Sequence, residues 1–223
     1  MVSTRFTDRS GGVSIAPYAA NNLAFHVGDE RESVTQNRER LQKLIGPTAF
    51  MNQFHGDRVV VVDGLPAEAP NADALITQEV GISLAVLVAD CIPLLLWDES
   101  LQCVAAVHVG RVGLVNGIAG KVIGIMAAMG AQRIQGALGP SICGKCYQVG
   151  PDIYEEVCKV YPSAKSKTKS GHLALDLPGA LSGSLSAAGI AVTRSWICTA
   201  ESLDHFSYRR DGITGRQAGI IRL

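Results

Sequence analysis

The sequence has no excess of charge of either sign and few aromatic residues. Its 20 basic and 20 acidic side chains give a formal net charge of zero, and aromatic residues make up 5% of the 223 residues. Zero net charge argues against a protein that binds nucleic-acid polymers by neutralising many phosphates. Hydrophobic residues make up 47% of the chain, which excludes intrinsic disorder and requires a core of mainly aliphatic side chains.

The chain also lacks a long uninterrupted apolar segment. Its most apolar run, at 82–97, is shorter than a membrane span and contains Asp90 and Pro93. The amino-terminal stretch MVSTRFTDRSGG has no apolar segment typical of a secretory signal. Six cysteines are too few for a disulfide scaffold in a chain of this length. We therefore expect a cytoplasmic protein with reduced thiols and no membrane partner.

Hydrophobic periodicity predicts an α+β fold. Short runs rich in Val, Ile and Leu predict strands at 58–62, 74–77, 83–88, 93–97, 103–107, 133–138, 190–197 and 217–222. Helical spacing of apolar residues predicts helices at 31–44, 113–129, 151–161 and 177–188, and the lysine- and serine-rich stretch 163–172 is expected to be an exposed loop. Strands come in runs instead of alternating strictly with helices, which favours α+β over a doubly wound fold. No linker divides the chain, so residues 1–223 are expected to form a single domain.

Polar residues at the ends of apolar strands form the strongest candidate site. His55 precedes one predicted strand, Asp90 and Cys91 close another, and His108 ends a third. Two imidazoles and one thiolate suit Zn²⁺, and three protein ligands leave a fourth position for water or substrate. Asp90 is then the candidate base. Each residue taken alone is more often a hydrogen-bonded or packed residue of the core, and their spacing along the chain is no ligand signature.

The remaining cysteines give a weaker signal. Cys143 and Cys146 form a single CxxC, which is weak evidence for zinc without a second pair. A redox role is one alternative, and two loop thiols without a special role are the simpler interpretation. Cys103, Cys158 and Cys198 are interpreted as packing residues.

A carboxyl-terminal loop, FSYRRDGITGR, contains Arg209, Arg210 and Arg216. Paired arginines on such a loop can bind a phosphate or a carboxylate through bidentate hydrogen bonds, and a solvated turn is the alternative interpretation. The glycine-rich segment HVGRVGLVNGIAG matches neither GxGxxG nor GxxxxGK[ST], so the sequence contains no nucleotide fingerprint.

Taken together, several segments resemble a known family. The matching blocks run from Phe6 to Ile221 and read FTDRSGGVS, NNLAFHVGDE, QFHGDRVVVVD, ADALIT, VADCIPLLLWD, AAVHVG, ALGPSICGKCYQVG and FSYRRDGITGRQAGII. They resemble the multicopper polyphenol oxidase (laccase-domain) family, whose members are also described as purine nucleoside phosphorylases and as peptidoglycan editing factors. The resemblance implies an α+β domain with mixed β-sheets sandwiched between helices.

The resemblance also implies a metal site. His55, Cys91 and His108 each fall on a motif position that supplies a metal ligand in the family. The implied metal is zinc, with copper as the alternative.

The implied activity is zinc-dependent phosphorolysis of adenosine or inosine to the free base and ribose 1-phosphate, and adenosine deamination is described for the same site. Cys91 and Asp90 are then the catalytic residues, with Asp90 orienting water or a ribose hydroxyl. Arg209 and Arg210 are the expected phosphate ligands. The expected partners are therefore a nucleoside and phosphate.

Other functions remain open at this point. A copper-dependent polyphenol oxidase is disfavoured because multicopper chemistry needs more histidines than the five in this chain. A hydrolase that edits cell-wall precursors would use Cys91 as a thiol nucleophile and His108 as its base. A binding module without catalysis is a further alternative.

One segment departs from the family pattern. The family typically has His-Ala-Gly-Trp-Arg-Gly after the third ligand strand, whereas this chain has His-Val-Gly-Arg-Val-Gly at 108–113. Arg111 and Val112 replace the usual Trp and Arg. Neighbouring side chains of an extended segment point to opposite faces, so Arg111 is not expected to substitute for the missing arginine. The departure bears on the identity of the substrate and leaves the three ligands intact.

Overall fold

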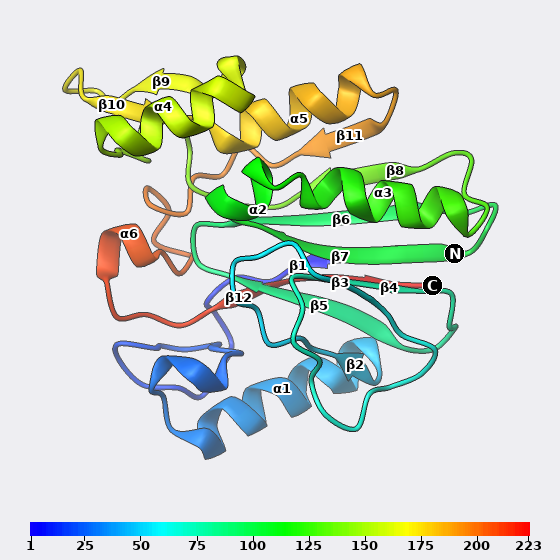
Figure 1. Ribbon diagram of the computed structural model, residues 1–223. Helices are drawn as coiled ribbons and strands as arrows, with labels where there is room; N and C mark the ends of the chain where they lie inside the picture. The colour runs from blue at the N-terminus through cyan, green and yellow to red at the C-terminus, as the bar shows by residue number, and fades with distance from the viewer.

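Two mixed β-sheets pack face to face between two layers of helices (Figure 1). The computed structural model describes residues 1–223. The first sheet has the order β1-β12-β5-β2 and consists of β1 (Ser3–Phe6), β12 (Gln217–Arg222), β5 (Ser83–Val88) and β2 (Thr48–Ala49). The second has the order β11-β8-β6-β7-β4-β3 and consists of β11 (Ala191–Arg194), β8 (Gln135–Leu138), β6 (Ile92–Asp98), β7 (Cys103–Val109), β4 (Ala74–Thr77) and β3 (Val59–Val61).

Helices cover both outer faces of this pair of sheets. Helix α1 (Arg31–Ile45) lies against the four-stranded sheet, and the other long helices lie against the six-stranded sheet (Figure 1). The remaining elements are α2 (Arg111–Val115), α3 (Ile118–Ala128), α4 (Pro151–Val160), α5 (Leu177–Ala187), α6 (Tyr208–Asp211), the 3-10 turns η1 (Phe25–Val27) and η2 (Pro162–Ala164), and the hairpin β9 (Lys165–Lys167)–β10 (Leu173–Leu175). Three strand pairs are parallel, β2/β5, β3/β4 and β8/β11, and the others are antiparallel. The predicted α+β class is confirmed.

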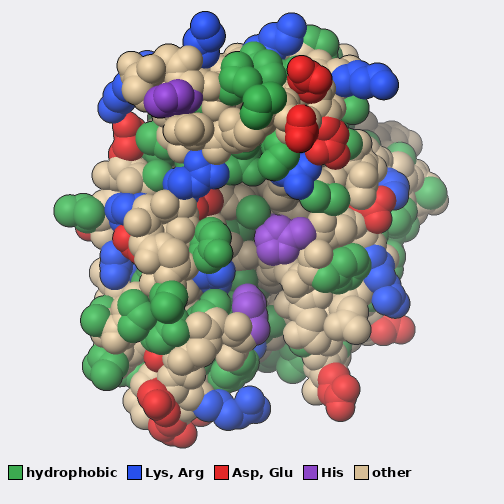
Figure 2. Space-filling view, turned by 60° about the vertical axis from the view of Figure 1, so that its left-hand side comes forward, with side chains coloured by type: hydrophobic (Ala, Val, Ile, Leu, Met, Phe, Trp, Pro, Cys, Tyr) green, Lys and Arg blue, Asp and Glu red, His purple; other side chains and the backbone are tan.

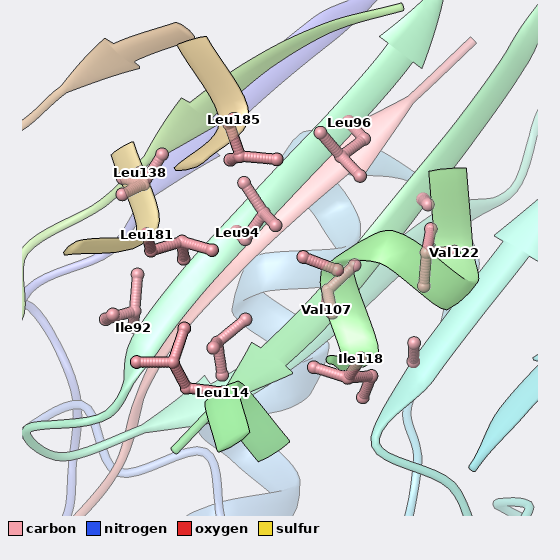
Figure 3. Packing of buried hydrophobic residues seen from close by; sticks show 14 of the residues in the cluster. Ile92, Leu94, Leu96, Val107, Leu114, Ile118, Val122, Leu138, Leu181 and Leu185 are labelled. Carbon is pink, nitrogen blue, oxygen red and sulfur yellow. The ribbon is translucent and has the colours of Figure 1, made fainter. Parts of the chain in front are cut away.

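The central strands are continuously apolar because both of their faces are buried. In β6, Leu94 and Leu96 belong to the core on the helical side, whereas Leu95 belongs to the core between the two sheets. Figure 3 shows Leu94 and Leu96 on the side of Leu114 and Ile118 from α2 and α3. Because successive side chains of a strand point to opposite faces, one apolar run supplies two cores.

The structure differs from the sequence prediction in several elements, among them the strands expected at 133–138 and 190–197, which are shorter (Gln135–Leu138 and Ala191–Arg194). The helix expected at 113–129 is two helices, which are separated at Asn116 and Gly117, where Gly117 adopts a φ of 73°. The first of them begins at Arg111, earlier than expected. The stretch 163–172 contains η2 and strand β9, so it is not simply a loop. The prediction also missed the short elements β1, β2, β10 and α6.

None of the helices combines the length and the apolar character that crossing a membrane would require.

Candidate active site

The register of three strands brings distant residues to one edge of the six-stranded sheet. Strand β7 lies between β4 and β6 and is antiparallel to both. Ala74 at the start of β4 pairs with Val107, and Ile92 at the start of β6 pairs with Val109. The starts of β4 and β6 therefore meet the end of β7. Asp73, Cys91 and His108 occupy these strand ends.

His55 reaches the same place from the loop before β3. Its backbone N–H donates to Asp73 Oδ1 over 3.0 Å, and the N–H of Gly56 donates to Asp73 Oδ2 over 2.8 Å. His55 has a φ of 63°, which is uncommon for a residue other than glycine. Such a conformation persists where its surroundings fix it, and the two hydrogen bonds to Asp73 fix this loop.

The structure brings together His55, Cys91 and His108, called the ligand trio below. Their potential ligand atoms all lie within 4.8 Å of one another, and the two imidazole rings are 4.7 Å apart in an edge-on arrangement. His108 is buried, Cys91 is half-buried and His55 is exposed. A Cβ on Gly110 would lie 3.3 Å from both Cys91 Sγ and His55 Cδ2. Only glycine leaves this side of the ligand trio uncrowded.

Asp73 fixes the orientation of His108, and the sequence analysis did not identify it. Its Oδ1 lies 2.8 Å from His108 Nδ1, and its side chain is fully buried. Burial raises the pKa of Asp73, but the hydrogen bonds from His108 and from the backbone of Gly56 and His55 leave it below its usual value. The ionised carboxylate accepts the Nδ1 proton, which leaves Nε2 of His108 with a lone pair for a metal ion.

The electrostatics of the ligand trio favour a thiolate. Burial alone would raise the pKa of Cys91, but the charge of His108 and hydrogen bonds with His108 and His55 lower this pKa to about 6. Burial alone would lower the pKa of His108, but the Cys91 thiolate and the Asp73 carboxylate raise it to about 9. Without a metal ion, both shifts favour a thiolate next to an imidazolium. A thiolate and two imidazoles, one of them backed by a carboxylate, fit the ligand chemistry of zinc.

A cavity of about 690 Å³ opens above the ligand trio. Figure 2 looks onto this side of the molecule and shows a hollow with histidine side chains along it and Lys or Arg side chains beside it. The cavity is lined by the ligand trio and by His26, Gln53, Leu87, Val88, Ala89, Asp90, Arg111, Val112, Tyr147, Tyr208, Arg209 and Arg216. Its volume lies within the range of about 300–1,000 Å³ that is typical of small-molecule sites.

Asp90 lines the cavity, but both of its carboxylate oxygens have partners. Oδ1 accepts a hydrogen bond from Thr199 Oγ1 at 2.6 Å, and Oδ2 accepts one from the backbone N–H of Arg209 at 2.6 Å. Asp90 has a φ of 92° and a relative exposure of 9%. The carboxylate thus anchors the start of α6 beside the ligand trio. Its catalytic role stays a prediction.

Two of the three arginines of the carboxyl-terminal loop line the cavity, and the third makes contacts within the fold. Arg209 and Arg216 line the cavity. Arg210 is not among the lining residues, because its guanidinium pairs with Asp211 and donates to the carbonyls of Thr199, Ser202 and His205. Phosphate binding by Arg210 stays a prediction, and the geometry favours Arg209 and Arg216 over it.

Arg111 and Val112 do not lie on an extended segment with side chains on opposite faces, so this expectation is wrong. Both residues lie in the first turn of α2, and both line the cavity. Neighbouring side chains of a helix are separated by about 100° around its axis, so both can face one cavity. Arg111 also donates to Glu156 Oε2 over 2.8 Å.

One sequence signal could have identified Asp73. It is the polar residue directly before the apolar strand β4, which is the same pattern that singled out the other strand-end residues. Tyr147, in a loop, and His26, in the 3-10 turn η1, also line the cavity and carry no comparable signal.

Comparisons with known proteins place the chain in a family. The family model described as multi-copper polyphenol oxidoreductase laccase matches residues 3–223. A purine nucleoside phosphorylase of Streptomyces griseus is 45% identical over 98% of this chain and 93% of its own length, and one of Streptomyces coelicolor is 44% identical over 98% and 94%. The superposition with a crystal structure of a Neisseria meningitidis protein covers 100% of this chain and 94% of the Neisseria chain. Its TM-score is 0.90, and the two sequences are 37% identical.

Proposed function

Because the chain belongs to the multi-copper polyphenol oxidoreductase laccase family, and its similar relatives are named purine nucleoside phosphorylases, we propose that it is an enzyme of that activity. The observation that carries the proposal is the composition of one cavity. The ligand trio, Arg111, Arg209 and Arg216 line the same cavity of about 690 Å³, and of the three arginines Arg209 and Arg216 have no carboxylate partner. A nucleoside and a phosphate ion need a site of this size with a local positive charge.

The proposed reaction is phosphorolysis of adenosine or inosine. A phosphate oxygen forms a bond to C1′ of the ribose, the bond from C1′ to the base nitrogen breaks, and the base leaves with a proton from the site. The products are the free base and ribose 1-phosphate. Two demands follow for the protein: it has to hold the phosphate next to the ribose, and it has to exclude bulk water as a competing nucleophile.

We assign the phosphate to the arginines of the cavity. Arg209 donates through Nη1 to the carbonyls of Cys146 and Gln148, and Arg216 donates through Nη1 to the carbonyl of Thr214. These bonds fix both guanidinium groups but use only part of their donors. The remaining N–H groups are free for a bidentate bond to phosphate.

The ligand trio is the proposed zinc site. His108 would bind through Nε2, because its Nδ1 proton is held by Asp73, and Cys91 would bind as the thiolate. A zinc ion there would supply Lewis acidity to the substrate. Asp90 keeps α6, and with it Arg209, beside the ligands through its hydrogen bond to the Arg209 backbone. Tyr147 and Tyr208 supply aromatic rings at the cavity on which a purine base can stack.

The test is product analysis with the purified, zinc-loaded chain. Adenosine and inosine are incubated with and without phosphate, and base and ribose 1-phosphate are quantified by chromatography. Phosphate-dependent release of adenine or hypoxanthine supports the proposal. Conversion of adenosine to inosine at equal rates with and without phosphate would show deamination. Absence of turnover of both nucleosides under all conditions refutes the proposal, and oxidation of phenols by the copper-loaded chain alone would assign it to the oxidases.

One observation favours a second candidate. Cys91, His108 and Asp73 stand in the order of a nucleophile, its base and the carboxylate that orients the base. This arrangement suits a thiol hydrolase, for example one that acts on cell-wall precursors. Protection by zinc separates the two candidates. Iodoacetamide should modify Cys91 in the metal-free chain, and added zinc should block the modification while raising activity if the metal mechanism holds. A thiol hydrolase would instead lose activity when zinc is added.

A further inference from the structure

A second set of potential metal ligands lies outside the ligand trio. The Sγ atoms of Cys143, Cys146 and Cys198 and a carboxylate oxygen of Glu201 all lie within 4.8 Å of one another. These residues are called the thiol cluster below. The sequence showed only the pair Cys143 and Cys146, and Cys198, which was interpreted as a packing residue, is buried beside them. The fold supplies the third thiol and the carboxylate from a segment more than 50 positions away.

Each half of the thiol cluster is a tight turn with a ligand at both ends. The backbone N–H of Cys146 donates to the carbonyl of Cys143 over 3.0 Å. In the same way, the N–H of Glu201 donates to the carbonyl of Cys198 over 3.1 Å. The two halves therefore read CxxC and CxxE, with the ligand spacing found in structural zinc sites.

Backbone hydrogen bonds hold the two turns against each other. Ser141 and Cys198 form a parallel β-bridge, in which the N–H of Ser141 donates to Ile197 over 3.3 Å and the N–H of Thr199 donates to Ser141 over 3.2 Å. The N–H of Cys143 donates directly to Cys198 Sγ over 3.3 Å. Such a hydrogen bond to sulfur stabilises a thiolate ligand and fixes its position.

We propose that the thiol cluster binds a structural zinc ion through three thiolates and one carboxylate oxygen. Ligands about 2.3 Å from a tetrahedral zinc ion are separated from one another by roughly 3.7 Å. The ligand atoms, which all lie within 4.8 Å of one another, would have to approach by about an ångström to reach this geometry. The carboxylate favours zinc over Cu⁺, because Cu⁺ prefers sulfur ligands alone.

The surroundings of the thiol cluster suit a metal ion with several anionic ligands. Lys169 Nζ donates to Glu201 Oε1 over 2.9 Å, which leaves Oε2 for the metal and orients the carboxylate. Lys145, between the two cysteines of the first turn, adds a second positive charge close to Glu201. Glu201 is exposed, and Cys143 and Cys146 are partly exposed, so a metal ion can enter from solvent.

A zinc ion here would stabilise two segments that contact residues lining the cavity. The carbonyl of Cys146 accepts a hydrogen bond from Arg209, and Thr199, next to Cys198, donates to Asp90 over 2.6 Å. The ion would cross-link the two segments that carry these contacts. The inference does not rest on the proposed function, because it concerns metal binding and local order whatever the cavity binds.

The first test is zinc stoichiometry by elemental analysis of the full chain, purified with a reductant and then equilibrated with zinc. We expect two zinc ions per wild-type chain, one in C91A, which removes a ligand of the trio, and one in the double variant C143S/C198S. The matched control is C158A, which removes a buried thiol outside both groups and should retain two. E201Q, a change at an exposed position, should keep the fold and weaken the second site.

The second test leaves the thiol cluster unaltered. X-ray absorption at the zinc edge of C91A should show three sulfur ligands at about 2.3 Å and one oxygen. Hydrogen exchange of residues 143–147 and 198–202 in C91A should slow when zinc is added. The absence of zinc from C91A, a shell of oxygen and nitrogen only, or a disulfide among the three thiols under reducing conditions would each overturn the inference. None of these results decides whether the chain cleaves nucleosides.

Discussion

Replacing Asp73 by asparagine should weaken zinc binding to the ligand trio while keeping the shape of the side chain. Asp73 is fully buried and accepts three hydrogen bonds. Its Oδ1 accepts from His108 Nδ1 and from the backbone N–H of His55, and its Oδ2 accepts from the N–H of Gly56. An asparagine has only one oxygen for these three donors.

Both orientations of the asparagine carry a cost. If its oxygen faces His108, its amide group meets the N–H of Gly56, and a buried donor without a partner costs about 1–3 kcal/mol. If the amide faces His108 instead, Nδ1 has to accept, the proton moves to Nε2, and the lone pair for the metal is lost. We therefore expect the zinc Kd to rise by about 10- to 100-fold, which is about 1.4–2.7 kcal/mol.

The assay is a competition titration against a chromophoric zinc chelator. It is carried out in the C143S/C198S background, so that only zinc binding to the ligand trio is measured. The control is D98N, because Asp98 is also fully buried, accepts hydrogen bonds from the backbone of Gln132 and Arg133, and lies at the opposite end of β6. Both variants should lower the free energy of unfolding, but only D73N should raise the zinc Kd. An unchanged zinc Kd in folded D73N would refute the role given to Asp73.

Three further predictions concern the cavity. Gly110→Ala should weaken zinc binding by roughly 1–3 kcal/mol through crowding of the ligand trio, whereas Gly120→Ala, where the added Cβ meets open space, should leave the zinc titration unchanged. In the metal-free chain, the rate of Cys91 alkylation should be half-maximal near its pKa of about 6, because the thiolate persists above that pH; a midpoint near the ordinary value of about 8.5 would contradict the pairing with imidazole. Arg209→Gln should raise the KM for phosphate by about 10- to 100-fold, as expected for a lost charge-assisted bond, with a smaller effect on the nucleoside KM. Arg210→Gln should instead lower the melting temperature, and equal effects of Arg209→Gln on both KM values would speak against phosphate binding.

The central strands could be predicted because burial of both faces makes their sequences continuously apolar. Strands at 83–88 and 217–222 begin and end as predicted. The break between α2 and α3 could not be predicted from apolar spacing, because both helices present an apolar face to the same core, as Leu114 and Ile118 do. The break depends on the left-handed conformation of Gly117. Glycine adopts this conformation readily, but a glycine in the sequence does not by itself show that the conformation is present.

The two sets of ligands differ in how far the sequence predicted them. The residues of the ligand trio were candidates because Cys91 and His108 end predicted apolar strands and His55 precedes one, and the family resemblance, not this pattern, then implied that they bind a metal. The thiol cluster was missed because its second half, Cys198 and Glu201, lies in a polar loop without periodicity. Its position depends on the parallel β-bridge from Ser141 to Cys198, a long-range contact that no local pattern reports.

The type of partner that each arginine has explains how a chain of zero net charge can offer a site for an anion. Arg210 pairs with the carboxylate of Asp211, so its charge is compensated within the fold. Arg209 and Arg216 donate to backbone carbonyls instead, which fix the position of a guanidinium without neutralising it. Asp90, the one carboxylate that lines the cavity, accepts hydrogen bonds from Thr199 and from a backbone N–H, which hold it in place and leave it a single negative charge. Two guanidinium groups without carboxylate partners therefore face one carboxylate in the cavity, a local excess of positive charge that the zero net charge of the chain does not reveal and that suits a small anion.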